Sequence, residues 1–208
     1  MISKRLKALA SLVDTKSIID VGCDHALLDV YLTQKGIKCR GTDISSNCIK
    51  LAKENLKKYN LEDKIELFVT DGLNGIDILD TDTIVIAGMG TNTILDIIKN
   101  INNPLILLSN NDIFKLRKEV IKKGYYIDNE LAIKDGKYYY TIIKFKKGNK
   151  KYKYSDYILG PILKNNNKDY YKYLYNKHLK NYNNISFKNI FKKISEKRIL
   201  KIIKSNIN

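Results

Sequence analysis

The chain has 208 residues, 44% of them hydrophobic, which is enough to bury the core of one domain with a small appendage. Its two histidines and three cysteines include no Cys-x-x-Cys pair, so the composition favours neither a metal site nor a disulfide framework. The net charge is +16, yet no apolar run is long enough to cross a membrane, and we expect a cytoplasmic protein.

Strand-like and helical patterns alternate along the first two thirds of the chain, as in a parallel sheet covered by crossover helices. Strands are predicted at residues 17–22, 38–43, 65–70, 83–87 and 105–108, and helices at residues 26–36, 46–59, 92–100 and 112–123. Two further β-rich runs, 125–133 and 138–146, flank an Asp-Gly turn that is typical of a hairpin. We therefore predict an α/β fold with a mostly parallel seven-stranded sheet that ends in an antiparallel pair.

The last third of the chain differs in charge. Residues 1–143 hold 20 Lys and Arg against 19 Asp and Glu, whereas residues 144–208 hold 18 against 3. A general bias of the amino-acid composition toward lysine would affect both parts of the chain alike. We therefore interpret the excess of positive charge in residues 144–208 as a face that binds a polyanion. We expect a catalytic domain at residues 1–148 and a basic helical hairpin at residues 149–208.

Two helices are predicted in this basic segment, after breaks at Gly148 and at Gly160-Pro161 and with a loop at residues 183–186 between them. Apolar residues mark one face of each helix: Leu163, Tyr170, Tyr171, Leu174 and His178 on the first, and Phe187, Ile190, Phe191, Ile194, Ile199 and Ile202 on the second. This apolar seam needs a partner, which is either its own other half or a neighbouring chain.

The first strand ends in a turn that suggests a bound adenosyl group. Its sequence, Ile-Ile-Asp-Val-Gly-Cys-Asp from residue 18 to 24, keeps only the first glycine of the G-x-G-x-x-G string that clamps a pyrophosphate. Gly22 allows close approach of the backbone, and a charged residue at the second glycine position suits a cationic ligand without phosphates, such as S-adenosylmethionine. Asp43, 23 residues after Asp20, is placed to accept both ribose hydroxyls.

Polar or glycine residues also follow the later strands. Asp71-Gly72 follows the third strand, where a carboxylate can accept from the amine of an adenine. Gly88 and Gly90 end the fourth strand beside the reactive end of such a cofactor, and Asn110 lies just past the fifth. Because the carboxyl ends of parallel strands meet at one edge, we expect these residues to lie together.

The chain resembles the bacterial tRNA methyltransferases that modify N1 of the adenine at position 22. The resemblance covers roughly residues 1 to 163 and is carried by the strings Ser3-Lys4-Arg5-Leu6, Asp20-Val-Gly-Cys-Asp-His-Ala26, Asp71-Gly-Leu73, Ile86-Ala-Gly-Met-Gly90 and Asp135-Gly-Lys-Tyr138. It implies a Rossmann-like class I methyltransferase domain, a small coiled-coil-like helical domain, S-adenosylmethionine as methyl donor with S-adenosylhomocysteine as product, and tRNA as partner. No metal, membrane or protein partner is implied, and we expect a monomer or weak dimer.

The resemblance also assigns residues to roles. The cofactor-binding residues that it implies are Asp20, Gly22, Cys23, His25, Asp43, Ile44, Asp71, Gly72, Leu73 and Gly88. The transferred methyl faces Met89 and Asn110, the Asn110 carbonyl accepts from the adenine N6 amine, and Asp24 is a second polar contact.

Three positions depart from the family pattern: Asp29 replaces a proline, Thr91 a glycine, and Leu108-Ser109 a Gln-Pro pair. Other functions therefore stay open, namely a class I methyltransferase for another RNA base or a protein, a non-catalytic RNA-binding protein with a degenerate nucleotide fold, and a Rossmann oxidoreductase.

Overall fold

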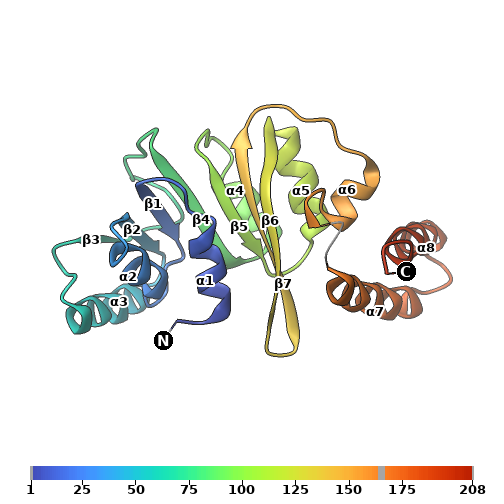
Figure 1. Ribbon diagram of the computed structural model, residues 1–208, viewed down its shortest axis with the longest axis horizontal. Helices are drawn as coiled ribbons and strands as arrows, with labels where there is room; N and C mark the ends of the chain where they lie inside the picture. Colours follow the sequence, from blue (N-terminus) through green and yellow to red (C-terminus); the bar gives the residue numbers. More distant parts are fainter. Residues whose placement is uncertain (1, 164–166, 208) are drawn as a thin grey trace.

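The computed structural model describes residues 2–163 and 167–207. Its centre is a seven-stranded sheet of order β3-β2-β1-β4-β5-β7-β6 (Figure 1). The strands are β1 (Ser17–Val21), β2 (Lys38–Asp43), β3 (Ile65–Val69), β4 (Asp82–Met89), β5 (Leu105–Ser109), β6 (Tyr125–Asp135) and β7 (Tyr138–Lys147). The first five are parallel, and β7 is antiparallel to both β5 and β6. The predicted mostly parallel sheet with an antiparallel edge pair is confirmed.

Helices cover both faces of the sheet, because the central strands are apolar on both sides. The helices are α1 (Lys4–Ser11), α2 (Leu27–Thr33), α3 (Ser46–Tyr59), α4 (Thr91–Ile97) and α5 (Ile113–Lys122). Along β1, Ile18 belongs to the core beneath α1, α2 and α3, and Ile19 to the core beneath α4 and α5. The side chains of Ser3, Ser45 and Asp112 cap α1, α3 and α5 by accepting from the main chain three residues on.

In the described part of the chain beyond the sheet there are three α-helices, not the predicted two: α6 (Tyr154–Leu159), α7 (Lys168–Asn184) and α8 (Ile190–Lys204). The short α6 was missed because six residues carry too little periodicity. It begins where Asp156 accepts from the Lys153 amide at 2.7 Å and ends at Gly160, whose φ of +84° favours glycine. Phe187, predicted on the second helix, lies in the loop before α8.

The helices α7 and α8 lie side by side beyond the β6–β7 edge of the sheet (Figure 1). Tyr170, Tyr171 and Leu174 are buried in a third core, which Ile199 and Ile202 of α8 also contact. The C-terminal helices α6, α7 and α8, here called the tail, thus bury part of the predicted apolar seam against one another. The start of α8 stays open, since Phe187, Ile190, Phe191 and Ile194 are exposed.

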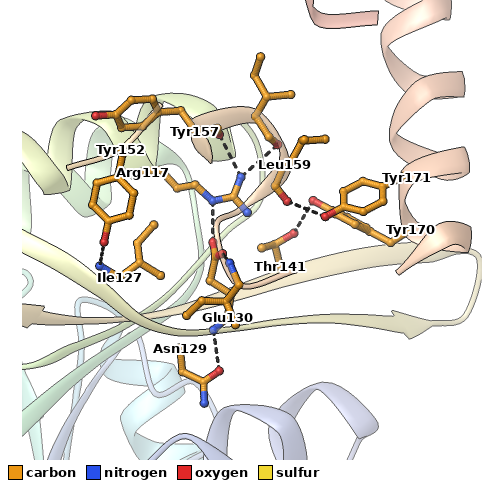
Figure 2. A network of polar contacts seen from close by, with 12 residues as sticks. Arg117, Ile127, Asn129, Glu130, Thr141, Tyr152, Tyr157, Leu159, Tyr170 and Tyr171 are labelled. Carbon is orange, nitrogen blue, oxygen red and sulfur yellow. Dashed lines mark hydrogen bonds and ion pairs between the residues drawn. The ribbon is translucent and has the colours of Figure 1, made fainter. Parts of the chain in front are cut away.

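A buried ion pair joins these helices to the sheet. Arg117 of α5 and Glu130 of β6 are both fully buried, and Arg117 Nε donates to Glu130 Oε1 at 2.7 Å. Arg117 Nη1 also donates to the Tyr157 carbonyl of α6 at 3.0 Å, and Tyr171 of α7 donates its hydroxyl to the Leu159 carbonyl at 3.1 Å (Figure 2). The C-terminal helices are therefore fixed to the sheet through α6 and α7.

Gly160 is required at this junction for a second reason. A Cβ on this residue would come within 2.6 Å of Glu130 Oε2 and 2.8 Å of Arg117 Nη2. The chain can pass the ion pair only where it carries no side chain.

Among residues 2–163 and 167–207, no helix combines the length and apolar character that crossing a bilayer requires.

Candidate active site

The carboxyl ends of the five parallel strands form one edge, as the sequence predicts. There β1 lies between β2 and β4, so the turn after Val21 is flanked by Asp43 and Met89. The chain order reverses between β1 and β4, which is where open α/β sheets bind ligands. Asp71 and Asn110 follow the outer strands β3 and β5 of this edge.

The turn after β1 has an unusual backbone held in place by its neighbours. Gly22, Asp24 and Ala26 have φ values of +77°, +50° and +53°. The Gly22 and Cys23 amides both donate to the Thr42 carbonyl, at 2.8 and 3.0 Å. A Cβ on Gly22 would lie 2.5 Å from Met89 Cε, so glycine lets the first turn and the end of β4 meet.

The side chains of this turn divide into exposed and buried groups. Those of Asp24 and His25 are 67% and 45% exposed, with Asp24 Oδ1 and His25 Nε2 3.4 Å apart. Cys23 is buried, and burial followed by the charge of Asp20 raises the pKa of its thiol far above the usual range. The Cys23 side chain therefore stays neutral beneath the turn.

Asp20 is also nearly buried and contacts a second buried acid, Asp29 of α2. Burial raises the pKa of Asp20, and the charge of Asp29 raises it further; burial raises the pKa of Asp29 to about 7. Neither carboxyl oxygen of Asp29 meets a donor among the described residues. Two adjacent buried carboxylates repel each other, and a shared proton satisfies both groups. Asp29, which stands where the family has a proline, thus shares a proton with the buried Asp20 carboxyl.

Asp43 presents its carboxylate to the main chain on both sides of the crevice. Its Oδ2 accepts from the Asp24 amide at 3.2 Å and its Oδ1 from the Ser45 amide at 2.9 Å. Each carboxylate oxygen retains a free acceptor site for a ligand hydroxyl. The adjacent Ile44 side chain is 71% exposed, which leaves an apolar surface beside this carboxylate.

The Asp71–Leu73 loop lies past β3. Thr42 donates its hydroxyl to the Gly72 carbonyl at 2.9 Å, and Gly72 has a φ of +63°. This bond ties the loop to the end of β2, while the side chain of Asp71 remains exposed. The loop can therefore offer a carboxylate without moving its backbone.

Asn110 is held against the end of β4. Its main-chain amide donates to the Met89 carbonyl at 2.9 Å, and its side-chain amide donates to the Gly88 carbonyl. With the Nδ2 group engaged, the side-chain oxygen is left to accept a hydrogen bond from a ligand. The pairing of β4 with β5 shifts register between Ala87 and Met89, which brings Gly88 to this contact.

A cavity of 340 Å³, here called the acceptor pocket, opens beside Asn110. Its other walls come from the β6–β7 hairpin and from α7, and include Tyr138, Tyr139, Tyr140, Tyr173 and Lys177. The rings of Tyr139 and Tyr173 lie 5.2 Å apart. The sequence gives no signal that α7 reaches this edge, so Lys177 was missed as a site residue.

Two of the departures from the family pattern contact each other. The hydroxyls of Thr91 and Ser109 lie 2.8 Å apart, and the Thr91 amide donates to Asn111 Oδ1 at 2.9 Å. Leu108 is fully buried in the core. Thr91 and Ser109 therefore hydrogen-bond to each other next to Asn110. Asn111, which accepts from the Thr91 amide, was not identified from the sequence.

Comparisons with known proteins show which family the chain resembles. Residues 2–143 match a family described as "Methyltransferase domain". A candidate tRNA methyltransferase of Mycoplasma genitalium is 32% identical over 174 residues, which is 78% of each chain. The tRNA (adenine(22)-N(1))-methyltransferase of Bacillus subtilis is 30% identical over 152 residues, or 68% of this chain and 64% of that protein.

A solved structure extends the similarity to the tail. The M. capricolum protein TrmK, in complex with the cofactor product S-adenosyl-homocysteine, is 28% identical and superposes with a TM-score of 0.85. The match covers 100% of this chain and 98% of that one, so it includes the C-terminal helices.

Proposed function

Because the chain belongs to the family of bacterial tRNA (adenine-N1)-methyltransferases, we propose that it transfers a methyl group from S-adenosylmethionine to N1 of an adenine in tRNA. By analogy with the relatives, the target is the adenine at position 22. We place this activity in the cytoplasm, on a monomer or weak dimer. The observation that carries the proposal is Asn110, whose free carbonyl opens into the acceptor pocket from the strand end beside the first turn.

The crevice has the charge that a sulfonium cofactor requires. Asp24, Asp43 and Asp71 surround it with carboxylates, and its first turn carries no Lys or Arg. When bound, S-adenosylmethionine supplies an electrophilic methyl group. We assign its methionine end to Asp20, Gly22, Cys23, Asp24 and His25, its ribose to Asp43, its adenine to Ile44 and to Asp71, Gly72 and Leu73, and its methyl side to Gly88 and Met89.

The chain's contribution to catalysis is chiefly alignment. Adenine N1 carries an in-plane lone pair and needs no general base for the attack. Asn110 accepts from the N6 amine and so fixes N1 toward Met89; guanine presents an acceptor at that position and is rejected. Correct positioning of two reactants can lower the activation free energy by about 7–11 kcal/mol. Asp24 is the second candidate for a polar contact.

N1 lies on the Watson–Crick edge, so a paired target has to leave its helix, which costs a few kcal/mol. Tyrosines of the acceptor pocket can stack on the extruded base, and lysines of the tail can contact phosphates. Tyr171, in contrast, is fully buried and serves the core. The basic end of the chain thus supplies the RNA contacts that offset extrusion.

The direct test is incubation with methyl-labelled S-adenosylmethionine and unmodified tRNA, followed by nucleoside analysis. Label in 1-methyladenosine is expected. Label in another nucleoside or in protein would show a class I methyltransferase with a different acceptor. Failure of the cofactor to bind in calorimetry would favour the non-catalytic RNA-binding alternative.

A further inference from the structure

A second cavity, of 420 Å³, lies among the start of α5 and the helices α6, α7 and α8. Its walls include Phe114, Tyr154, His178, Asn181 and Glu196. Methyl transfer at Asn110 makes no use of these residues. The volume falls within the range of small-molecule sites, roughly 300–1,000 Å³, and can hold a nucleobase with its ribose.

This cavity adjoins the acceptor pocket. The two share the wall residues Asn111, Ile113, Leu174 and Lys177. A base that enters the acceptor pocket is covalently linked to neighbours in its own strand, and one neighbour then lies over this shared wall. Enzymes that act on extruded bases read flanking nucleotides by contacts of this kind.

The walls offer the groups that bind an unstacked base. Phe114 and Tyr154 pack edge to face with ring centroids 5.6 Å apart, and they supply the apolar wall. His178 Nδ1 lies 2.7 Å from Glu196 Oε2, which fixes the ring and leaves Nε2 to a ligand. Asn181 adds an amide that both donates and accepts, and the exposed Lys177 lies at the boundary where a phosphate would pass.

We propose that this cavity, the flanking-nucleotide pocket, receives the nucleotide next to the target adenine in the same RNA strand. The proposal rests on the proposed function, because it requires an adenine in the acceptor pocket. It assigns sequence-context recognition to the helical tail and methyl transfer to the sheet edge. Arg117 attaches α6 to the sheet and Tyr171 attaches α7 to α6, which keeps the two pockets in fixed register.

The test uses the full chain and tRNA transcripts in which one neighbour of the target adenine, on either side, is replaced by an abasic nucleotide. For the wild-type protein, one abasic position should lower kcat/KM by about 10-fold, the equivalent of one lost base–aromatic stack. Ser195→Trp, which fills the pocket from α8, should cause a similar loss on normal tRNA and no further loss on that abasic substrate. Asn181→Ala is a milder second variant that should show the same pattern.

Ser205→Trp, at the C-cap of α8 and outside the pocket, is the matched control and should behave as the wild type. Calorimetry should show unchanged S-adenosylmethionine binding by every variant. Equal activity on all substrates with Ser195→Trp would overturn the pocket assignment while leaving the proposed function intact. Losses that add to the abasic effect would also overturn it, because they indicate disturbed helix packing. A wild type that methylates no RNA would remove the proposed function and this proposal together.

Discussion

The carboxyl edge of the sheet and the junction with the C-terminal helices both depend on polar side chains, but they hold them differently. At the edge, Asp24 is 67% exposed, and Asp43 and Asn110 are fixed by main-chain groups while keeping free acceptor sites. At the junction, Arg117 and Glu130 are fully buried and bonded to each other. Edge residues should therefore affect function with little effect on stability, and junction residues the reverse.

The largest expected effect is at the junction. Arg117→Met leaves the Glu130 carboxylate buried without its partner and should lower the free energy of unfolding by roughly 3–5 kcal/mol. Urea denaturation monitored by circular dichroism measures this loss. Arg117→Met combined with Glu130→Met is the control and should be less damaging than the single change, because no charge stays buried. A single variant as stable as the wild type would break the distinction between the two regions.

The next effect is at the edge. Asn110→Ala removes the group that aligns the adenine and should lower single-turnover methylation by about 100-fold. S-adenosylmethionine affinity and unfolding should change little, because the Asn110 side chain is exposed. Asn102→Ala, at an exposed position before the start of β5, is the control with the same chemical change. If Asn110→Ala lost stability or cofactor binding in proportion to its rate, the edge would be structural too.

Asp29 combines features of both regions, because it lies beneath the carboxyl edge of the sheet and yet is as buried as the junction residues. Burial raises its pKa to about 7, so the folded chain holds the proton shared with Asp20 more tightly than the unfolded chain does. Stability should therefore fall as pH rises from about 4, the unfolded value, to about 7. The other titratable groups nearby are Cys23, Cys39 and Asp43, and both thiols stay neutral over this window.

Asp29→Asn keeps a donor to Asp20 and does not titrate. Its stability relative to the wild type should improve across that window by up to about 1.4 kcal/mol per pH unit, as measured by urea unfolding at several pH values. Parallel pH profiles of the two proteins would show that no proton is shared.

The sequence predicts the sheet and the composition of its edge because both depend on local patterns. Buried strands appear as continuous Ile and Val, and Asp43, Gly88 and Asn110 each follow such a run. The acceptor pocket could not be predicted, since it forms where α7 meets the β6–β7 hairpin, far apart in sequence. Nor could the raised pKa of Asp20, which is caused by burial and then by the charge of Asp29 on α2.

The junction escaped prediction for the same reason. Arg117 has the appearance of a surface residue on an amphipathic helix, and only the later course of α6 buries it. Long-range contacts of this kind leave no periodic signal along the chain.

Primer extension on tRNA after treatment with the protein and S-adenosylmethionine tests the central claim most directly, because a methyl group at N1 blocks base pairing. A single arrest next to one adenine, which requires both the cofactor and Asn110, is the predicted result. Full extension of tRNA that has nonetheless acquired the methyl group, or an arrest that persists unchanged with Asn110→Ala, would contradict the assignment of the acceptor pocket.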